Sequence, residues 1–292
     1  MKKTILLLAV AFGITNVFAQ DLKSKKDEPI LPEAGDWALS IDAAPVLTYF
    51  GHFLSNTGAT SPTWGYPGTP LAITGKYFKD DKTAYRAMVR LGFGSTTTNA
   101  YSEQDGQTTP DPSVTVKDSW KASYHNIILG AGIEMRKGKT RLQGYYGGMF
   151  MIGFGGSDNK YTYGNSFSKT NLLPTRKDFG NDNLGNDNYS AVGPTYNTQD
   201  KAGSTMMIGL RGFIGAEYFL FPKISIGAEF GWGLFFSHRG DGSTTREYWD
   251  GVNNALKTQT IKNAGTSTFG FDTDVNGQQV MPTGTLNLTM HF

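Results

Sequence analysis

The chain has 292 residues, and its 27 Lys and Arg side chains against 25 Asp and Glu give a formal net charge of only +2. Such a balance gives no reason to expect a nucleic-acid partner or an anionic surface as partner. The absence of cysteine excludes disulfides, thiolate metal sites and a cysteine nucleophile.

The first nineteen residues have the pattern of an export signal. Lys2 and Lys3 precede an apolar run over residues 5–14, and Ala19 supplies the small residue that a signal peptidase accepts before Gln20. The run is too short to span a bilayer as a helix. We therefore expect residues 1–19 to be removed near Ala19, which leaves 27 − 2 = 25 basic against 25 acidic side chains.

Residues 20–35 are charged and contain two prolines, a composition that predicts a flexible periplasmic leader. From Trp37 onward apolar residues recur at every second position, which is the period of a strand with two different faces. Eight such segments are each near the 9 to 11 residues with which a tilted strand crosses a membrane. They cover residues 37–43, 71–77, 85–93, 127–135, 142–154, 206–218, 224–236 and 284–292.

The connections between these segments alternate in length. Residues 79–82, 137–139 and 219–223 form short turns, whereas residues 51–70, 95–119, 156–204 and 238–280 form long connections. Short turns at one end and long loops at the other are the rule for bacterial outer-membrane barrels. The sequence therefore predicts an all-β fold over residues 36–292: an eight-stranded antiparallel transmembrane β-barrel with three short periplasmic turns and four long external loops.

The last segment, "GTLNLTMHF", ends on an aromatic residue in mid-strand, and a strand that must close a ring has reason to end there. It resembles the C-terminal assembly signal of outer-membrane proteins, carried here by Leu286, Leu288, Met290 and Phe292. The stretch "GAEYFLFPKISIGAEFGWGL" at 215–234 similarly resembles the hairpins of small porin-like barrels of the OmpA, OmpX and OmpW type. The resemblance implies a place in the bacterial outer membrane, with membrane lipid and the barrel-assembly machinery as partners.

The face opposite the apolar one carries charges of both signs. A ring of eight strands is just wide enough for its side chains to fill it, so we expect these residues to interlock as ion pairs in the lumen. A narrow conduit in which the pairs rearrange is the alternative. The predicted lumenal set is Asp42, Lys76, Arg86, Arg90, Glu134, Arg141, Arg211, Glu217 and Glu229.

Aromatic residues near the strand ends are expected to form the two interfacial belts of the barrel. At the periplasmic rim these are Tyr77, Phe78, Tyr218, Phe219 and Phe221, and at the outer rim Tyr49, Phe50, Trp120, Phe154 and Phe236.

Few residues suggest chemistry. His52 and His238 could meet at the outer ends of two strands, but zinc needs three or four ligands. Ser123 and His125 loosely resemble the pair of a lipid-A deacylase barrel without its residue order. The repeated "GNDN" at 180–183 and 185–188 offers oxygen ligands without calcium-loop spacing, and "RGD" at 239–241 is too short to carry an adhesive role. We predict no catalytic residue, no metal and no cofactor.

The sequence thus favours a non-enzymatic outer-membrane protein with a structural or surface-contact role through external loops rich in Tyr, Asn, Thr, Ser and Gly. An envelope protein or a surface ligand would be the partner at those loops. A narrow conduit for small or hydrophobic solutes is the alternative, and a lipid-modifying barrel enzyme is a third reading that the residues do not favour.

Overall fold

A computed structural model describes residues 22–43, 73–109, 111–179, 194–273 and 285–292. These residues form an antiparallel all-β fold, and they include no helix long and apolar enough to cross a membrane. The expected signal segment, residues 1–19, lies outside the described residues. The strands are β1 (Trp37–Asp42), β2 (Ile73–Phe78), β3 (Thr83–Glu103), β4 (Thr115–Lys137), β5 (Leu142–Thr162), β6 (Tyr196–Lys201), β7 (Thr205–Phe221), β8 (Ile224–Arg239), β9 (Gly242–Asp250), β10 (Ala255–Asn263), β11 (Thr266–Thr273) and β12 (Thr285–His291).

Eight of the strands pair in a closed cycle, which we call the ring. Its order is β1, β2, β3, β4, β5, β7, β8 and β12, and β12 pairs again with β1. At the seam Ile41 lies opposite Leu288, and the backbones of Trp37 and Phe292 exchange two hydrogen bonds of 2.8 Å. The last strand therefore pairs with the first, as its abrupt aromatic end predicted.

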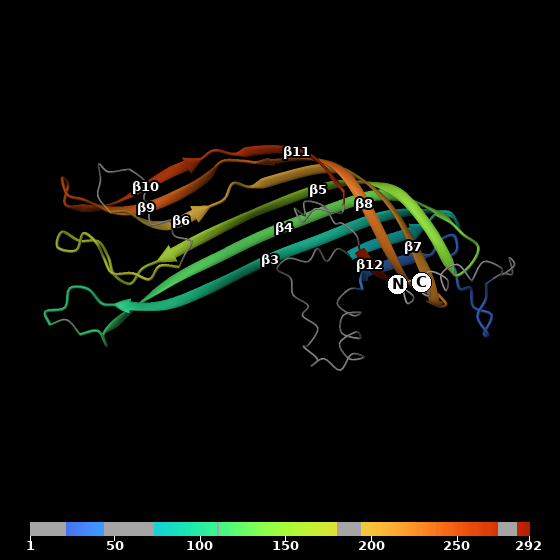
Figure 1. Ribbon diagram of the computed structural model, residues 1–292, viewed down its shortest axis with the longest axis horizontal. Coiled ribbons are helices and arrows are strands. Elements are labelled where there is room, and N and C mark those ends of the chain that lie inside the picture. The colour runs from blue at the N-terminus through green and yellow to red at the C-terminus, as the bar shows by residue number, and fades with distance from the viewer. Residues whose placement is uncertain (1–21, 44–72, 110, 180–193, 274–284) are drawn as a thin grey trace, which may run out of the picture.

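Three strands of the ring run well beyond it. β3, β4 and β5 contain 21, 23 and 21 residues, and β6, β9 and β10 continue the sheet from the far part of β5. Figure 1 shows these strands together on the left, away from β7 and β12. We call this part the outer extension. The described parts of the long connections at 95–119 and 238–280 are thus largely strand, and the connection at 156–204 contains the end of β5 and all of β6. The sequence does not predict these strands.

The reason lies in the solvent on the two faces of these strands. One stretch of β3 shows no apolar alternation, yet each of its residues is paired with β4: Ser95, Thr96, Thr97 and Thr98. Threonine favours the strand conformation, and a sheet with water on both faces needs no apolar face. Alternation therefore marks only the part of a strand that has one apolar side.

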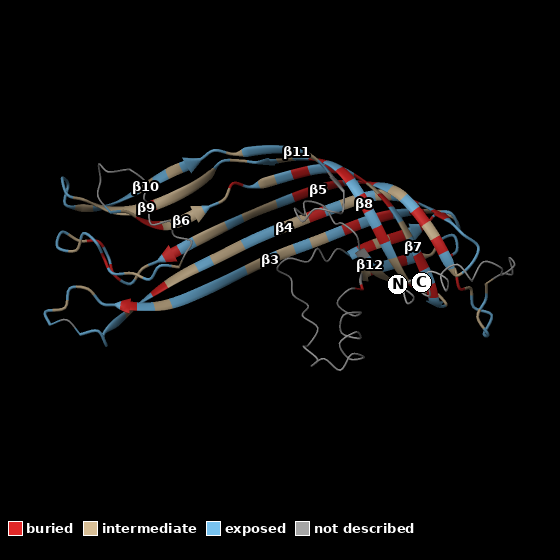
Figure 2. Ribbon diagram, in the orientation of Figure 1, coloured by how far each residue is buried: buried red, intermediate tan, exposed pale blue. Residues whose placement is uncertain are grey.

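Within the ring buried and exposed residues alternate along each strand, but the apolar side chains are the exposed ones, the reverse of a water-soluble protein. On β3, Tyr85, Val89 and Leu91 are exposed, whereas Arg86 and Met88 are buried. Figure 2 shows the same alternation on the other strands of the ring, and it fades along the outer extension. Large apolar side chains thus face outward and charged ones inward, which is the facing that the sequence predicted for the ring strands.

The three predicted short turns connect β2 to β3, β4 to β5 and β7 to β8. They are tight: Gly138 and Lys223 have φ angles of 144° and 59°, and a lysine rarely adopts such a conformation. All three lie at the end of the ring where the C-terminus lies (Figure 1). We call it the short-turn end.

In place of the expected flexible leader over 20–35, the described residues from 22 onward fold against the short-turn end. Lys23 bridges to Pro29, and the Ile30 amide donates to the Leu22 carbonyl oxygen at 2.9 Å. Ile30 is only 1% exposed, and its carbonyl accepts from the Lys223 amide at 3.2 Å. The charges that suggest disorder lie on the surface of this turn, while the buried Ile30 and Pro32 anchor it.

Candidate functional site: the interior of the ring

Glu134 on β4 lies at the centre of the buried charges and is fully buried itself. One of its carboxylate oxygens lies 2.9 Å from Lys76 Nζ and 3.4 Å from an Arg86 nitrogen. The other lies 2.9 Å from Arg136 Nη1. The neighbouring strands β2, β3 and β4 supply these three cations, so a single carboxylate connects cations from one side of the ring.

Two further carboxylates extend the cluster to the opposite wall. Glu229 on β8 pairs with Arg86 at 2.8 Å and with Arg211 at 2.6 Å. Glu217 on β7 pairs with Arg136 and accepts a hydrogen bond from Ser225 Oγ at 3.2 Å. The result is a continuous chain of ion pairs, which we call the charge network: Lys76, Arg86, Glu134, Arg136, Arg211, Glu217 and Glu229.

Aromatic rings cover the cations of the network. The Arg86 guanidinium lies 4.1 Å from the centre of the Phe213 ring, Arg136 lies 5.2 Å from Phe78, and Lys76 Nζ lies 4.8 Å from Tyr145. Cation–π contacts of this kind gain strength when they are desolvated. They let buried cations keep favourable neighbours beyond the carboxylates.

Phe78 and Phe219 lie inside the ring, not at the rim where the sequence reading placed them. Both are fully buried, and their rings lie 5.4 and 5.2 Å from the ring of His291, whose Nε2 lies 3.4 Å from Ser225 Oγ. Because Phe78 directly follows the outward Tyr77, it must point inward. Tyr77, Tyr218 and Phe221 are exposed as a belt requires, whereas Tyr49 and Phe50 lie outside the described residues.

The structure brings six of the nine predicted lumenal charges into the charge network. Arg90 is half-buried on the inward face of β3 and makes no ion pair with any described residue. Arg141 lies at the short-turn end, where it donates to the carbonyl oxygens of Phe219 and Leu220 at 3.2 and 3.1 Å. The backbone of Asp42 pairs with Asn287, and its side chain lies outside the described part of the chain.

Arg136 is the member that the sequence reading missed. The fourth predicted segment ends at Met135 and the predicted turn covers residues 137–139, so Arg136 belongs to neither. Continuing the alternation from Glu134 by two positions would have placed Arg136 on the inward face. Its 3% exposure and its contacts to two carboxylates make it as central as Arg86.

An apolar layer lies next to the charge network on the side of the outer extension. Four methionines contribute to it, and long unbranched side chains of this kind fill irregular gaps well. The buried side chains that form the cluster are Met88, Ile128, Tyr145, Met149, Met151, Met207, Phe213 and Phe235. Charge network and apolar layer together fill the middle of the ring.

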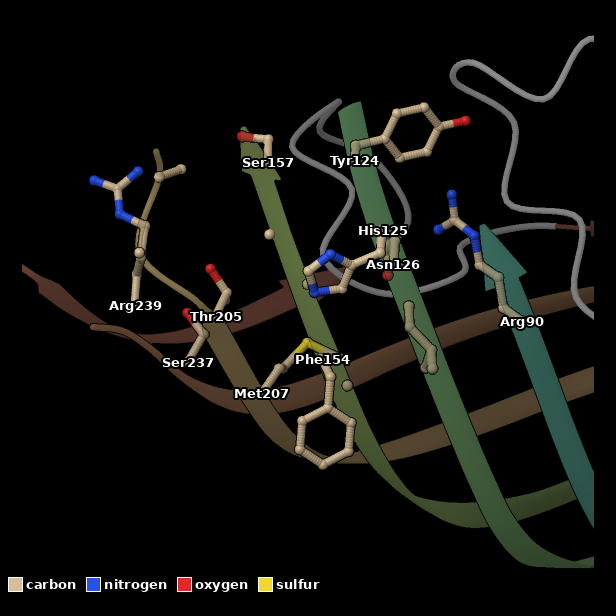
Figure 3. A pocket seen from close by; sticks show the side chains of 16 residues that line it. Arg90, Tyr124, His125, Asn126, Phe154, Ser157, Thr205, Met207, Ser237 and Arg239 are labelled. Atoms are coloured by element: carbon tan, nitrogen blue, oxygen red, sulfur yellow. The ribbon is translucent and has the colours of Figure 1, made fainter. Parts of the chain in front are cut away.

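Beyond this layer lies a cavity of about 460 Å³, the outer cavity. Figure 3 shows Arg90 and Arg239 at its opposite ends, with Asn126 and Met207 between them. Thr205 and Ser237 add hydroxyl groups to the wall, and none of the described residues that line it is a carboxylate. The outer cavity is therefore a cationic recess with an apolar floor.

The outer extension includes an ordered loop. The side chain of Asp118 is fully buried and accepts hydrogen bonds from Ser102 Oγ at 2.7 Å and from the amides of Gly164 and Lys177 at 2.8 and 2.7 Å. The Arg176 guanidinium lies 4.1 Å from the centre of the Tyr196 ring. Residues 163–179 are thus held to β3, β4 and β6 by specific contacts.

The other motifs of the sequence do not form sites among the described residues. Ser123 Oγ donates to the Asp158 carbonyl oxygen. Among the described residues, no hydrogen bond joins Ser123 to His125. His238 contacts Ser267 Oγ at 2.9 Å, and Asp241 of the "RGD" triplet accepts from the Gly265 amide at 3.0 Å. The described residues contain no group of three or more potential metal ligands. His52 and both "GNDN" repeats lie outside them.

No protein-family model and no curated protein matches this sequence. Among solved structures, the chain is similar to the outer membrane protein OprG from Pseudomonas aeruginosa, with 11% sequence identity and a TM-score of 0.29. The similarity covers 90% of this chain and 98% of that one.

Proposed function

We propose that the ring is an eight-stranded β-barrel that spans the bacterial outer membrane, closed in its middle and presenting the outer extension at the cell surface. Its role is structural and contact-making, without catalysis. The observation that carries the proposal is the inverted burial of the ring. Leu91 is 56% exposed and Leu210 is 61% exposed, whereas Glu134 is fully buried. Apolar area left in water costs about 25 cal/mol per Å², so such a surface is stable in lipid.

The height of the apolar surface supports the same conclusion. On β5 the outward apolar residues run from Leu142 to Phe154, which is about 40 Å along the strand at about 3.3 Å per residue. A tilt of about 45° reduces this to about 28 Å, close to the apolar band of about 25 Å in outer-membrane barrels. The short-turn end would then face the periplasm, together with the folded residues 22–36.

The contact-making role is supported by the order of the outer extension. The buried hydrogen bonds of Asp118 and the stacking of Arg176 on Tyr196 hold the loop over 163–179 against the sheet. A pre-organised surface loses less conformational entropy on binding than a mobile loop does. An envelope protein or a surface polysaccharide is the partner class that such an exposed platform would meet.

Cell fractionation and heat-modifiability test the proposal. The full-length protein should sediment with outer membranes, and unboiled samples should migrate differently from boiled ones in SDS gels. Recovery of the processed protein from the soluble periplasm, without a shift on boiling, would contradict it.

A narrow conduit is the second candidate, and the outer cavity is the observation that favours it. A solute that entered there would still meet the apolar layer and the charge network. Planar-bilayer recording separates the two proposals: we expect silence from the wild-type protein, and reproducible conductance steps would establish the conduit. Glu134→Gln removes the carboxylate that holds three cations, so it is the variant in which a leak should appear first.

A further inference from the structure

The outward surface of the ring is hollowed at one place. A groove of about 810 Å³ crosses β4, β5, β7 and β8, and large apolar side chains wall it. Its outward-facing wall residues include Tyr146, Phe150, Leu210, Trp232 and Phe271. This outer groove is separate from the outer cavity, which lies on the inner side of the same strands.

The strand register explains the hollow. Ile133, Gly148, Gly212 and Trp232 are successive partners across the four strands, so they stand in one row. The two central positions, Gly148 and Gly212, have no side chain. The row on one side of them contains Phe150 and Leu210, and the row on the other side contains Tyr146 and Ile214. The Trp232 ring lies over Gly212, where a Cβ atom would meet it at 2.9 Å. Gly148 is left as the open floor.

A cation lies at the short-turn end of the groove. Lys137 is exposed, and its Nζ lies 5.8 Å from the centre of the Tyr146 ring. Lys137 is paired with Gly144, four residues before Gly148, so about 13 Å separates the cation from the floor along the strand. That distance is less than half the hydrocarbon thickness of about 30 Å. One extended acyl chain is therefore long enough to reach from Lys137 to the floor of the groove at Gly148.

We infer that the outer groove binds an acyl chain of a periplasmic-leaflet phospholipid whose phosphate lies at Lys137. The inference depends on the proposed membrane-spanning ring, because only there does the groove face lipid. An acyl chain matches the apolar walls and fills a floor without side chains, and the phosphate complements the ammonium group. A second copy related by a twofold axis through the groove would place its own groove against this one. Two identical grooves face to face would leave the space between them unfilled.

Quenching of tryptophan fluorescence by brominated lipid tests the inference. We would keep Trp232 as the sole tryptophan, by Phe substitution of the other four, and reconstitute the full-length protein in phosphatidylcholine vesicles with dibrominated phosphatidylglycerol. Heat-modifiability of each variant reports folding independently. The anionic lipid should quench Trp232 with several-fold higher apparent affinity than dibrominated phosphatidylcholine does.

Two substitutions should remove this preference for different reasons. Gly148→Leu fills the floor, where the only atom near its Cβ is the Arg211 carbonyl oxygen at 3.8 Å, so the ring has room for it. Lys137→Gln removes the cation. Gly75→Leu is the matched control, since Gly75 faces outward on β2 with only the Ala87 carbonyl oxygen near its Cβ, at 4.0 Å, and it does not line the groove.

Each outcome decides the inference. Loss of preference in Gly148→Leu and Lys137→Gln, with none in Gly75→Leu, supports it. Equal quenching by both lipids, or unchanged preference in the two groove variants, overturns it while the folded, heat-modifiable protein leaves the proposed function standing. Absence of quenching together with a dimer in detergent would assign the groove to a second copy and also overturn it. A wild-type protein that neither inserts nor shifts on boiling refutes the membrane-spanning ring itself.

Discussion

Glu134 determines how the interior of the ring is held together. One buried carboxylate serves cations from three strands, and those cations reach two further carboxylates on the opposite wall. Burying an ion costs several kcal/mol, which only close partners offset. The consequence is that removing any member takes a close partner of opposite charge from at least one other buried member.

Substituting Arg86 tests this dependence. Arg86→Leu leaves Glu229 with one cation and Glu134 with two, so we expect a loss of about 3–5 kcal/mol in the free energy of unfolding. Arg211→Leu should act in the same direction. The measurement is urea unfolding in detergent micelles or the temperature of the gel shift in SDS. Arg90→Leu is the control, and an equal loss there would contradict a special role for the network.

Phe219 offers a test of the inward facing that the sequence reading missed. Phe219→Ala opens a cavity beside His291, and such truncations of a buried phenylalanine cost about 3–5 kcal/mol. Phe221→Ala removes a ring that is 62% exposed and should cost far less. If the two variants unfold at the same temperature, Phe219 is at the rim as first expected.

At the scale of the strands, the outer extension is stabilised separately from the ring. Its contacts include the buried hydrogen bonds of Asp118 and the stacking of Arg176 on Tyr196, and hydrogen bonds also change the pKa of one of its acids. Burial would raise the pKa of Asp105, but hydrogen bonds from Thr175 and Asn171 lower it below its usual value of 3.8. A lowered folded-state pKa means that Asp105 stabilises the loop fully above about pH 3.8.

Acid should therefore loosen this loop before it affects the ring. As the pH falls from 4 through the lowered pKa of Asp105, the carboxylate takes up a proton and accepts the hydrogen bonds from Asn171 and Thr175 more weakly. We expect pepsin to cleave within residues 163–179 increasingly over this range, while the heat-dependent gel shift persists. Asp105→Asn should be cleaved readily at every pH tested. Equal protection at pH 4 and pH 2 in the wild-type protein would refute the assignment.

The ring strands could be predicted from the sequence because an apolar outward face and a packed, charged interior impose a period of two. The facing of Arg86, Glu134, Arg211, Glu217 and Glu229 followed from it. The extended ends of β3, β4 and β5 could not be predicted in this way, since water on both faces imposes no period. The order of residues 22–36 is not predicted for a related reason: only two buried residues, Ile30 and Pro32, anchor a segment whose composition is otherwise that of a disordered one.

For the whole molecule, closure of the ring is the decisive feature. Ser40 on β1 and Thr289 on β12 face each other inside it, with 2.9 Å between their hydroxyl oxygens. The chain has no cysteine of its own, so Ser40→Cys with Thr289→Cys introduces one unambiguous pair. We expect oxidation to link them and to give a band of altered mobility in unreduced, boiled samples. Each single variant should show no such band, and a double variant that stays reduced would indicate an open sheet.

The same seam bears on the order of events during biogenesis. Ser40 and Thr289 are 249 positions apart, so nearly the whole chain must be present before β1 can pair with β12. Contacts of such separation form late, because the entropy of closing a long loop is lost before they can compensate for it. Until then the facing edges of β1 and β12 have unpaired backbone groups, which can form hydrogen bonds with other chains.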